Sequence, residues 1–458
     1  MKYFNISQRL IGLWLKIINW GLCLFIFLLP WQTRLIYHEA ILNKEVWEYG
    51  RLSLYGTEIL LVILIILGIV RKCLRYPEPQ VEAGFKPAFG VKDPITYAII
   101  AVIMFTGLSI IWSADKAIAA QAWLRILEGI GLFWLVYDTR QFMSNFKLAF
   151  IGSGAVQGLL AIYQFFTQST FASKWLGLPY IETNYLGASV IEFLDERWLR
   201  AYGSFPHPNI LGGFLAIVLL LIVIGLWQLN VKIKNQNEIL KADIYLNTFY
   251  WFSAGIVFLG LLFSFSRSAG LGFVLGFIYL FIYTLKNKLK IQRWLSIKLA
   301  IFFVALFGFI LIGWPYQLFT VRITTQSKLE QKSLIERQTA ITEAKAIFKT
   351  NPVIGIGLGN YTKQLQDKYP NYPGWAYQPV HNWHWLALSE LGFIGFLLFV
   401  FLLVNLWRRT GTIEKSLILV LLFISFFDHY FWDLFFGLML WWLVWGMVLD
   451  KENEFLTT

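Results

Sequence analysis

Charged residues are scarce in this chain of 458 residues, where Asp, Glu, Lys and Arg together make up 14%. A soluble globular domain contains about 25% of these residues. Hydrophobic residues reach 57%, and the mean hydropathy is +0.59. This balance excludes an ordinary soluble domain and predicts a polytopic membrane protein.

Cysteine is nearly absent, with only Cys23 and Cys73 in the chain. Cys23 falls in the first apolar run and Cys73 in the first long basic loop, which we expect in the membrane and the cytoplasm. We therefore expect no disulfide. The first apolar run also lacks a small-residue cleavage site, which predicts a retained helix and not a cleaved signal peptide.

Several common catalytic motifs are missing as well. The sequence contains neither the Gly-Lys-Ser/Thr of a phosphate-binding loop nor a Gly-x-Ser-x-Gly nucleophile elbow. The glycine-rich stretch 355–359 follows a predicted helix and a proline instead of a strand, so it does not fit a dinucleotide site. Paired carboxylates for glycoside hydrolysis are not evident either.

Long apolar runs are what the sequence has in abundance. A membrane-spanning helix needs about 20 apolar residues, and we predict twelve spans, at residues 11–30, 54–70, 95–113, 118–137, 146–166, 208–229, 246–265, 268–285, 298–315, 383–406, 416–430 and 432–449. The last two are short and joined by residues 428–433, so they could form one hairpin that barely crosses. Strand alternation of the kind a membrane barrel needs does not persist anywhere. We predict an all-α polytopic protein whose residues 1–458 form a single membrane domain.

The net charge of +12 comes from Lys and Arg in short loops between the runs. These loops follow the second, sixth, eighth and tenth runs, so all lie on one side if the N-terminus is inside. The positive-inside rule then places both termini in the cytoplasm. The basic charge thus indicates topology and not a nucleic-acid partner.

Two loops on the opposite, outer side are long, at residues 167–207 and 316–382. Loops of this length in a compact protein are usually functional or disordered. Ser327 and Glu330 fit a capping box, and apolar residues at helical spacing follow until Asn351-Pro352. The second loop is therefore predicted to contain a helix.

Arg200, His207 and Asn209 stand just before the sixth run. Prolines on both sides of His207 disfavour a helix, so this segment is predicted to be a shaped loop leading into the membrane. The plainer interpretation, equally open from the residues alone, is interfacial anchoring with Arg200 reaching the lipid headgroups.

Arg267 lies in a very tight outer turn, where a cation opposes the positive-inside bias. An arginine at such an edge is a functional candidate, although it could also cap the hairpin against lipid phosphate. Arg337 lies beside Glu336 on the predicted loop helix, where an ordinary solvated pair is the plainer interpretation.

His381 and Asn382 mark the point where the second outer loop re-enters the membrane, with His384 one turn on. Two histidines three apart, without a third ligand of matching spacing, are a weak zinc signal, and we expect no metal. A structural histidine is the plain alternative. Arg200, Arg267 and His381 are predicted on one membrane face. Arginine matches the geometry of phosphate oxygens, which suits a phosphate-bearing lipid donor. Imidazole accepts a proton near neutral pH, which suits a hydroxyl acceptor.

These motifs together resemble those of the O-antigen ligase and O-antigen polymerase superfamily of bacterial membrane glycosyltransferases. The similarity covers His381-Asn382-x9-Gly392-x-x-Gly395, Ser266-Arg267, and Arg337 followed by the Asn351-to-Tyr361 stretch with its three spaced glycines. It also covers Arg200 with the segment Gly203–Asn209, in which His207 replaces the usual Asn.

The resemblance implies a GT-C-like fold and a metal-independent, inverting transfer without a cofactor. The donor would be a glycan on an undecaprenyl-diphosphate carrier in the bacterial inner membrane. Arg200 and Arg267 would bind the diphosphate and His381 would act as the base. Asn382, Asn209, Arg337 and His207 would bind substrate.

Within the superfamily the acceptor stays open among lipid A core, a growing glycan and a protein hydroxyl; the broad ligase type is our first choice. A lipid flippase or transporter is the alternative class, and it would place paired charges near the membrane midplane. Arg125 and Glu128 are charges of that kind, and their plain interpretation is a buried ion pair.

Overall fold

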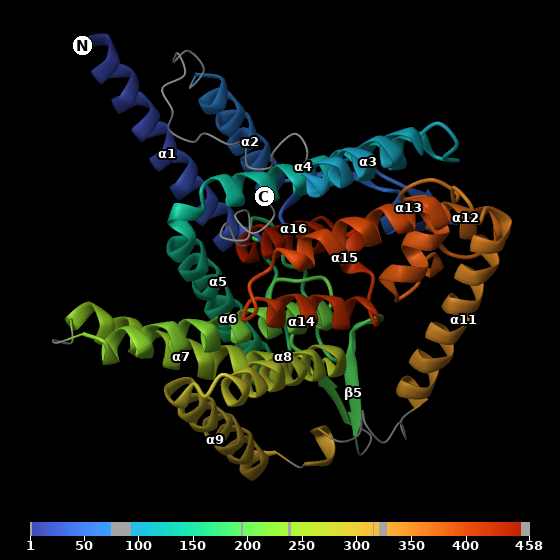
Figure 1. Cartoon of the computed structure of the whole chain (residues 1–458). Helices are drawn as coiled ribbons and strands as arrows, with labels where there is room; N and C mark the ends of the chain where they lie inside the picture. The colour runs from blue at the N-terminus through green and yellow to red at the C-terminus, as the bar shows by residue number, and fades with distance from the viewer. Residues whose placement is uncertain are drawn as a thin grey trace.

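The computed structural model describes residues 2–74, 93–193, 196–236, 240–314, 316–319 and 328–449, most of which are helical (Figure 1). The longer helices are α1 (Lys2–Leu28), α2 (Gly56–Leu74), α3 (Pro94–Leu108), α4 (Lys116–Asp138), α5 (Met143–Thr167), α6 (Pro208–Lys234), α7 (Lys241–Phe263), α8 (Arg267–Lys286), α9 (Lys290–Gly313), α11 (Lys328–Thr350), α13 (Trp383–Arg408), α14 (Lys415–Ser425) and α16 (Phe435–Val448). Two short α-helices are α12 (Tyr361–Lys368) and α15 (Tyr430–Asp433).

Each of the twelve predicted apolar runs falls on one of these helices. Among the described residues, seven helical segments are long and apolar enough to cross a membrane, and four further apolar helices are shorter. The prediction of a mostly helical membrane protein is therefore confirmed. α14 and α16 have 11 and 14 residues, fewer than the roughly 20 that a full span requires, as predicted for the last two runs.

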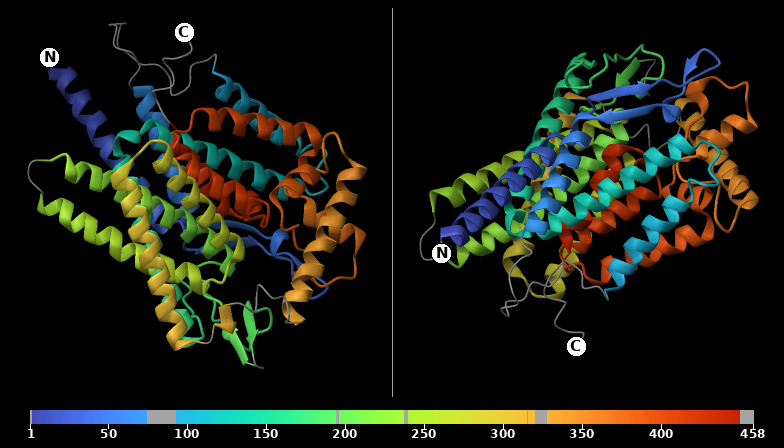
Figure 2. Two further views of the ribbon diagram at one scale, coloured as in Figure 1. Left: turned by 60° about the horizontal axis from the view of Figure 1, so that its bottom comes forward. Right: turned by 90° about the horizontal axis from the view of Figure 1, so that it is seen from above.

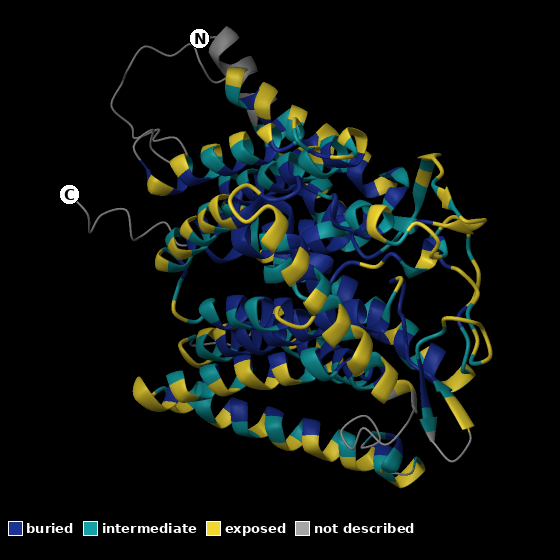
Figure 3. Ribbon diagram, turned by 90° about the vertical axis from the view of Figure 1, so that its right-hand side faces the viewer, coloured by how far each residue is buried: buried dark blue, intermediate teal, exposed yellow. Residues whose placement is uncertain are grey.

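Helix α6 forms the centre of the bundle, in contact with α5, α7, α8, α9 and α14. Its most apolar stretch is buried on all sides, which is the environment that a helix apolar all round requires. Figure 3 shows the same division for the whole molecule, with buried residues inside and exposed ones on the peripheral helices. The N-terminus of α6 is thereby fixed deep in the protein.

A small β structure that the sequence did not predict covers one end of the bundle. Strands β1 (Arg34–His38) and β4 (Leu52–Tyr55) pair antiparallel, with β2 (Ile41–Leu42), β3 (Glu45–Val46) and the 3-10 turn η1 (Glu48–Gly50) between them. At the tip, the Asn43 amide donates to the carbonyls of Pro370 and Tyr372 at 2.9 and 2.6 Å. We call residues 31–55 the roof. A second hairpin, β5 (Val190–Phe193) with β6 (Glu196–Leu199), lies in the loop that precedes α6.

Helix α13 is broken at Gly392, whose backbone has φ 63° and ψ −168°. Residues 352–357 fill the break and form backbone hydrogen bonds with both halves. Toward the first half, Ile356 N–H donates to Ser389 O at 3.1 Å and Gly357 N–H donates to Glu390 O at 2.8 Å. From the second half, Phe393 N–H donates to Pro352 O at 2.8 Å and Ile394 N–H donates to Val353 O at 3.1 Å. A Cβ on Gly392 would lie 2.5 Å from Gly355 N, and one on Gly355 would lie 2.5 Å from Gly392 N. The two glycine motifs of the sequence therefore interlock.

The long loops gather at one end of the bundle. In Figures 1 and 2 the helices α11 and α12 lie at this end, opposite the turn between α6 and α7. Helix α11 confirms the predicted loop helix and its end before Asn351; Ser327 of the predicted capping box lies outside the described residues. The expected Arg125–Glu128 pair differs in the structure, where Arg125 pairs with Glu58 of α2 at 3.8 Å.

Candidate functional site

The loop before α6 is held by two glutamines of α5. The Gln164 carbonyl oxygen accepts from the backbone N–H groups of Tyr202 and Gly203, both at 2.8 Å, and Gln157 accepts from Ser204 N–H at 2.8 Å. Gly203 has φ +58°, and a Cβ there would lie 2.7 Å from the Gln157 side-chain oxygen. Only glycine fits this position without strain.

His207 and Asn209 begin helix α6. His207 is the N-cap, and its Nδ1 accepts from Asn209 N–H at 3.1 Å, while Pro208 occupies the first helical position. Proline suits that position because its missing N–H would have no helical partner. The loop geometry thus places Asn209 at the buried start of the central helix.

Arg200 and Asn209 form a continuous polar chain with Asp428. The Arg200 guanidinium is buried and donates to Asn209 Oδ1 at 2.7 Å and to the Ser264 carbonyl at 2.9 Å. The Asn209 amide in turn donates to Asp428 Oδ2 at 3.2 Å. Asp428 lies between α14 and α15, so this chain joins three distant parts of the sequence.

Arg267 begins α8 three residues after Ser264. The first turns of α6 and α8 pack closely, since a Cβ on Gly212 would lie 2.6 Å from the Ser266 Cβ. Two helix N-termini, each the positive end of a helix dipole, therefore lie beside Arg200 and Arg267. Such a setting favours an anion.

His381 approaches the same carboxylate from the other side. Its Nδ1 lies 3.6 Å from Asp428 Oδ1, an ion-pair distance slightly longer than a hydrogen bond, and its side chain is 37% exposed. Asn382 caps α13 by accepting from Trp385 N–H at 3.0 Å, and its amide donates to the Phe426 carbonyl at 2.9 Å. Asn382 thereby ties the start of α13 to the end of α14 and fixes His381 above Asp428.

A second imidazole, His429, completes the group. Its Nδ1 lies 2.8 Å from Asp433 Oδ2, and its ring centre lies 5.0 Å from that of His381. Burial alone would raise the pKa of Asp428, but His381, His429 and His207 lower it well below its usual value. Burial alone would lower the pKa of His429, but the charge and hydrogen bond of Asp433 and the charge of Asp428 raise it. The site therefore alternates negative carboxylates with imidazoles.

A cavity of about 420 Å³ opens beside this group. His207, His381, Asp428 and His429 line it together with roof residues, among them Arg34. Of the other predicted site residues, all of which lie in described parts of the chain, none is in its wall: these are Arg200, Asn209, Arg267, Arg337 and Asn382. Arg200, Asn209 and Asn382 connect to the cavity through the contacts above.

Arg337, which was predicted as a site residue, and His384, which was not, lie apart from this polar chain. Arg337 is partly exposed on α11 and lines neither of the two described cavities. His384 stacks on Phe426 with ring centres 4.1 Å apart, which is a packing role.

The residues in the described part of the chain that could hold a metal are His381, Asp428 and His429, whose ligand-type atoms lie within 4.8 Å of one another. The sequence argument against a metal depended on the lack of a third ligand near His381 and His384. The fold supplies Asp428 and His429 from a distant segment instead. His429 Nδ1 already faces Asp433, which leaves only its Nε2 for a ligand.

Sequence reasoning missed Asp428, His429 and Asp433 as site residues. The available signal was their position: three ionisable groups within six residues at the junction of the last two apolar runs, on the predicted outer side. Such groups at a membrane edge are functional candidates by the argument that selected Arg267.

A family model described as O-antigen ligase matches residues 252–400, about a third of the chain, and this stretch contains Arg267, Arg337, His381 and Asn382. No curated protein sequence matches the chain. The family match supports the resemblance that the motifs indicated to the O-antigen ligase and polymerase superfamily, over residues 252–400.

Proposed function

We propose that this protein is a membrane glycosyltransferase that moves a glycan from an undecaprenyl-diphosphate carrier to an acceptor hydroxyl on the outer face of the inner membrane. The observation that carries the proposal is the chain Arg200–Asn209–Asp428–His381 beside a cavity of about 420 Å³. It links a cation suited to diphosphate with an imidazole suited to a hydroxyl proton.

In the proposed reaction, the acceptor oxygen attacks the anomeric carbon from the face opposite the leaving group, which inverts the configuration. The carbon–oxygen bond to the diphosphate breaks, and the lipid diphosphate leaves with the electron pair. The hydroxyl proton passes to Nε2 of His381, because Nδ1 faces Asp428. Asp428 orients the ring and stabilises the imidazolium, as the carboxylate does in a catalytic triad.

Arg200 and Arg267, together with the N-termini of α6 and α8, would stabilise the negative charge that develops on the leaving diphosphate. His207 and Asn209 would help to bind this donor, and Arg337 would contact substrate from α11. Neither a cofactor nor a metal takes part in the proposal, because the lipid diphosphate bond supplies the energy and His381 supplies the base.

Lipid A core is the acceptor that we propose first, which makes the protein a ligase. A lipid-linked glycan as acceptor would make it a polymerase, and a protein hydroxyl would make it a protein glycosyltransferase. The three acceptors, offered separately to the purified protein, distinguish these activities.

The test is transfer from a defined lipid-diphosphate glycan by purified full-length protein in detergent. Arg200→Ala, Arg267→Ala, His381→Ala and Asp428→Asn should each lower turnover by about 10²- to 10⁴-fold, the range for lost charge stabilisation or acid–base catalysis. Arg293→Ala, a cation of α9 at the other end of the bundle, is the matched control and should keep its turnover. EDTA should not reduce turnover in the same assay.

Near wild-type transfer by folded Arg200→Ala, Arg267→Ala and His381→Ala proteins would refute this mechanism. Loss of turnover in EDTA that zinc restores would replace the metal-free base with the cluster of His381, Asp428 and His429. Detergent also removes the second compartment that a transporter needs, so transfer under these conditions counts against the flippase class.

A further inference from the structure

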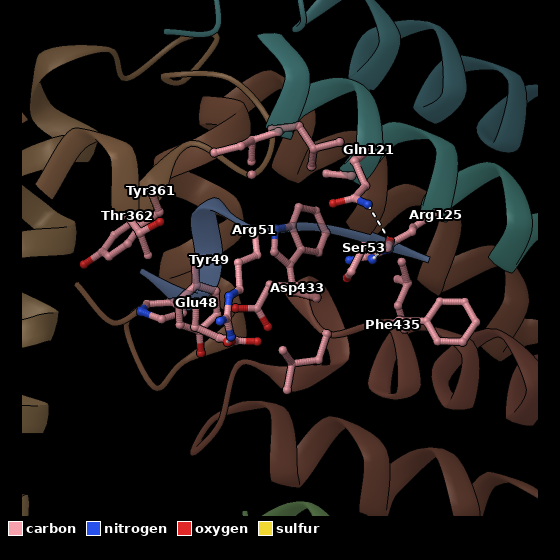
Figure 4. A pocket seen from close by; sticks show the side chains of 18 of the residues that line it. Glu48, Tyr49, Arg51, Ser53, Gln121, Arg125, Tyr361, Thr362, Asp433 and Phe435 are labelled. Atoms are coloured by element: carbon pink, nitrogen blue, oxygen red, sulfur yellow. Dashed lines mark hydrogen bonds and ion pairs between the residues drawn. The ribbon is translucent and has the colours of Figure 1, made fainter. Parts of the chain in front are cut away.

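A second, smaller cavity of about 90 Å³ lies under the roof (Figure 4). Its walls come from the roof, the first turns of α4, residues 358–362, α13, and the segment from α15 into α16. At about 10–15 Å³ for each water, this space suits a single small ring and not an oligosaccharide. The proposed function does not use this cavity.

The arginines in its wall all face a carboxylate, and of the carboxyl groups there, Glu390 is held by hydrogen bonds alone, from Trp432 Nε1 at 2.8 Å and Tyr361 N–H at 3.3 Å. Glu48 lies 2.5 Å from Arg34 and 2.9 Å from Arg51, and Arg125 lies 3.8 Å from Glu58. Figure 4 shows Glu48, Arg51 and Arg125 around the cavity. An anionic ligand is best bound by a cation that lacks a competing carboxylate. Paired charges with remaining donors and acceptors instead suit a neutral, hydroxyl-rich ligand.

The remaining wall combines aromatic faces with polar side chains. Tyr55 stacks on Phe435 with ring centres 4.9 Å apart, and Tyr49 lies beside it in the wall. Gln121 donates to the Ser53 carbonyl at 2.7 Å, which orients its amide. A sugar ring has apolar faces and a rim of hydroxyls, so aromatic faces with a few placed polar groups fit it.

Thr362 gives a second, independent indication of a ligand. Thr362 is 3% exposed and lines the small cavity. Its hydroxyl oxygen Oγ1 is buried and has no hydrogen-bond partner among the described residues. Buried hydroxyls in native proteins are nearly always hydrogen-bonded, because leaving one unpaired costs about 1–3 kcal/mol. A ligand hydroxyl in this cavity would provide the missing partner.

The small cavity adjoins the large one. Both are lined by Arg34, Glu48, Tyr49, Tyr55 and Leu434. None of the described residues 200–210 or 264–267, where the donor diphosphate is proposed to bind, lines the small cavity. A ring held there would therefore lie beside the reaction cavity and on the side away from the donor cations.

We propose that the small cavity is the acceptor subsite, which holds one neutral sugar ring of the acceptor and directs a hydroxyl into the large cavity toward His381. The assignment rests on the proposed glycosyl transfer. It adds the class of acceptor: a glycan whose reacting end is an uncharged sugar, in place of a protein side chain or a charged sugar.

The double variant Gln121→Leu/Thr362→Val tests the subsite, because it removes both polar groups with little change in volume. In the transfer assay it should raise the KM for acceptor roughly tenfold, or about 1.4 kcal/mol, because two hydrogen bonds to the acceptor are lost. The KM for donor should stay within about twofold. Gln338→Leu/Thr342→Val, the same changes at exposed positions of α11, is the matched control.

Direct binding provides a measurement that does not depend on transfer. Methyl glucoside and methyl glucuronide are added separately to the protein, and the fluorescence of Trp432 in the cavity wall is followed against Trp432→Phe. The neutral glycoside should bind more tightly, and the double variant should weaken it.

An unchanged acceptor KM together with unchanged glycoside binding in the double variant would overturn the subsite. Tighter binding of the glucuronide would overturn its neutral character. The two proposals fail separately: absence of transfer by the wild type counts against the proposed function, whereas glycoside binding still reports on the subsite.

Discussion

Asp428 is the single residue through which the parts of the site are connected. Its carboxylate accepts from Asn209 and from the backbone of His429, and it lies 3.6 Å from His381. A buried carboxylate is costly unless every lone pair finds a partner. Two of these partners come from the first turn of α6 and from the residue that precedes the N-cap of α13, so the carboxylate of Asp428 connects the starts of these two helices.

The pair His429–Asp433 predicts a folding stability that depends on pH. The pKa of His429 is raised in the folded protein, so protonated His429 stabilises the fold. This stabilisation is fully present below the pKa of His429 in the unfolded chain, about 6.5, and is lost as pH rises through the folded pKa. The melting temperature of the wild type in detergent should therefore fall more between about pH 6 and about pH 9 than that of His429→Gln.

His38→Gln, at an exposed position of β1, is the control and should follow the wild-type curve. If His429→Gln follows that curve too, the ion pair contributes nothing to folding stability.

The interlock between α13 and residues 352–357 is the element that sets the geometry of the site. It fixes the first half of α13, which begins at Trp383 after its cap Asn382, against residues 352–357. Unpaired backbone groups at membrane depth are tolerated only where the protein itself satisfies them. The break in α13 is therefore stable only with the loop in place.

Replacement of Gly392 by alanine tests this element. The residue has φ 63°, and the added Cβ would lie 2.5 Å from Gly355 N, so Gly392→Ala should destabilise by more than the 1–2 kcal/mol of a left-handed backbone alone. Thermal unfolding in detergent and transfer should both decline. Gly308→Ala, where a Cβ meets nothing within 4 Å on α9, should melt at or slightly above the wild-type temperature.

Equal melting temperatures for Gly392→Ala and Gly308→Ala would show that the interlock accommodates a side chain at Gly392 without loss of folding stability. If Gly392→Ala loses transfer activity but keeps the wild-type melting temperature, the break in α13 is needed for catalysis and not for folding stability.

The sequence predicted helices well and missed the irregular elements for a physical reason. Whether an apolar run forms a helix depends mainly on neighbouring residues in the sequence, and all twelve predicted runs coincide with helices. The strands of the roof have two to five residues, too short for an alternation to be recognised. The break at Gly392 depends on a partner 35 or more residues earlier, which no local pattern reveals.

At the scale of the whole molecule, Arg200, Asn209 and His381 are brought together through Asp428, whereas Arg337 lies apart on α11. Arg200, Asn209 and His381 were predicted as site residues because they are polar groups at the predicted outer edge of the membrane. Asp428 was missed because its contact with Asn209 joins positions 219 apart in sequence. Arg125 paired with Glu58 instead of Glu128, because neighbouring helices and not helical spacing decide which buried charges meet.

The predicted orientation can be tested by labelling in intact cells with a membrane-impermeant maleimide. Cys73 is exposed at the end of α2 and should be protected, because the positive-inside rule places it in the cytoplasm. Leu186→Cys, at a position 94% exposed in the loop before α6, should be labelled in a background that lacks Cys23 and Cys73. The reverse pattern would invert the topology and place the site in the cytoplasm.

The interlock also constrains how the protein is made. Residues 352–357 are synthesised before α13, and with the predicted topology they must cross the membrane before the two halves of α13 can be joined around them. Until then, backbone groups near Gly392 lack the partners that they have in the finished protein. With that topology, we expect the assembly of α13 to follow export of the large loop, and His381, two residues before that helix, to reach its place only after both steps.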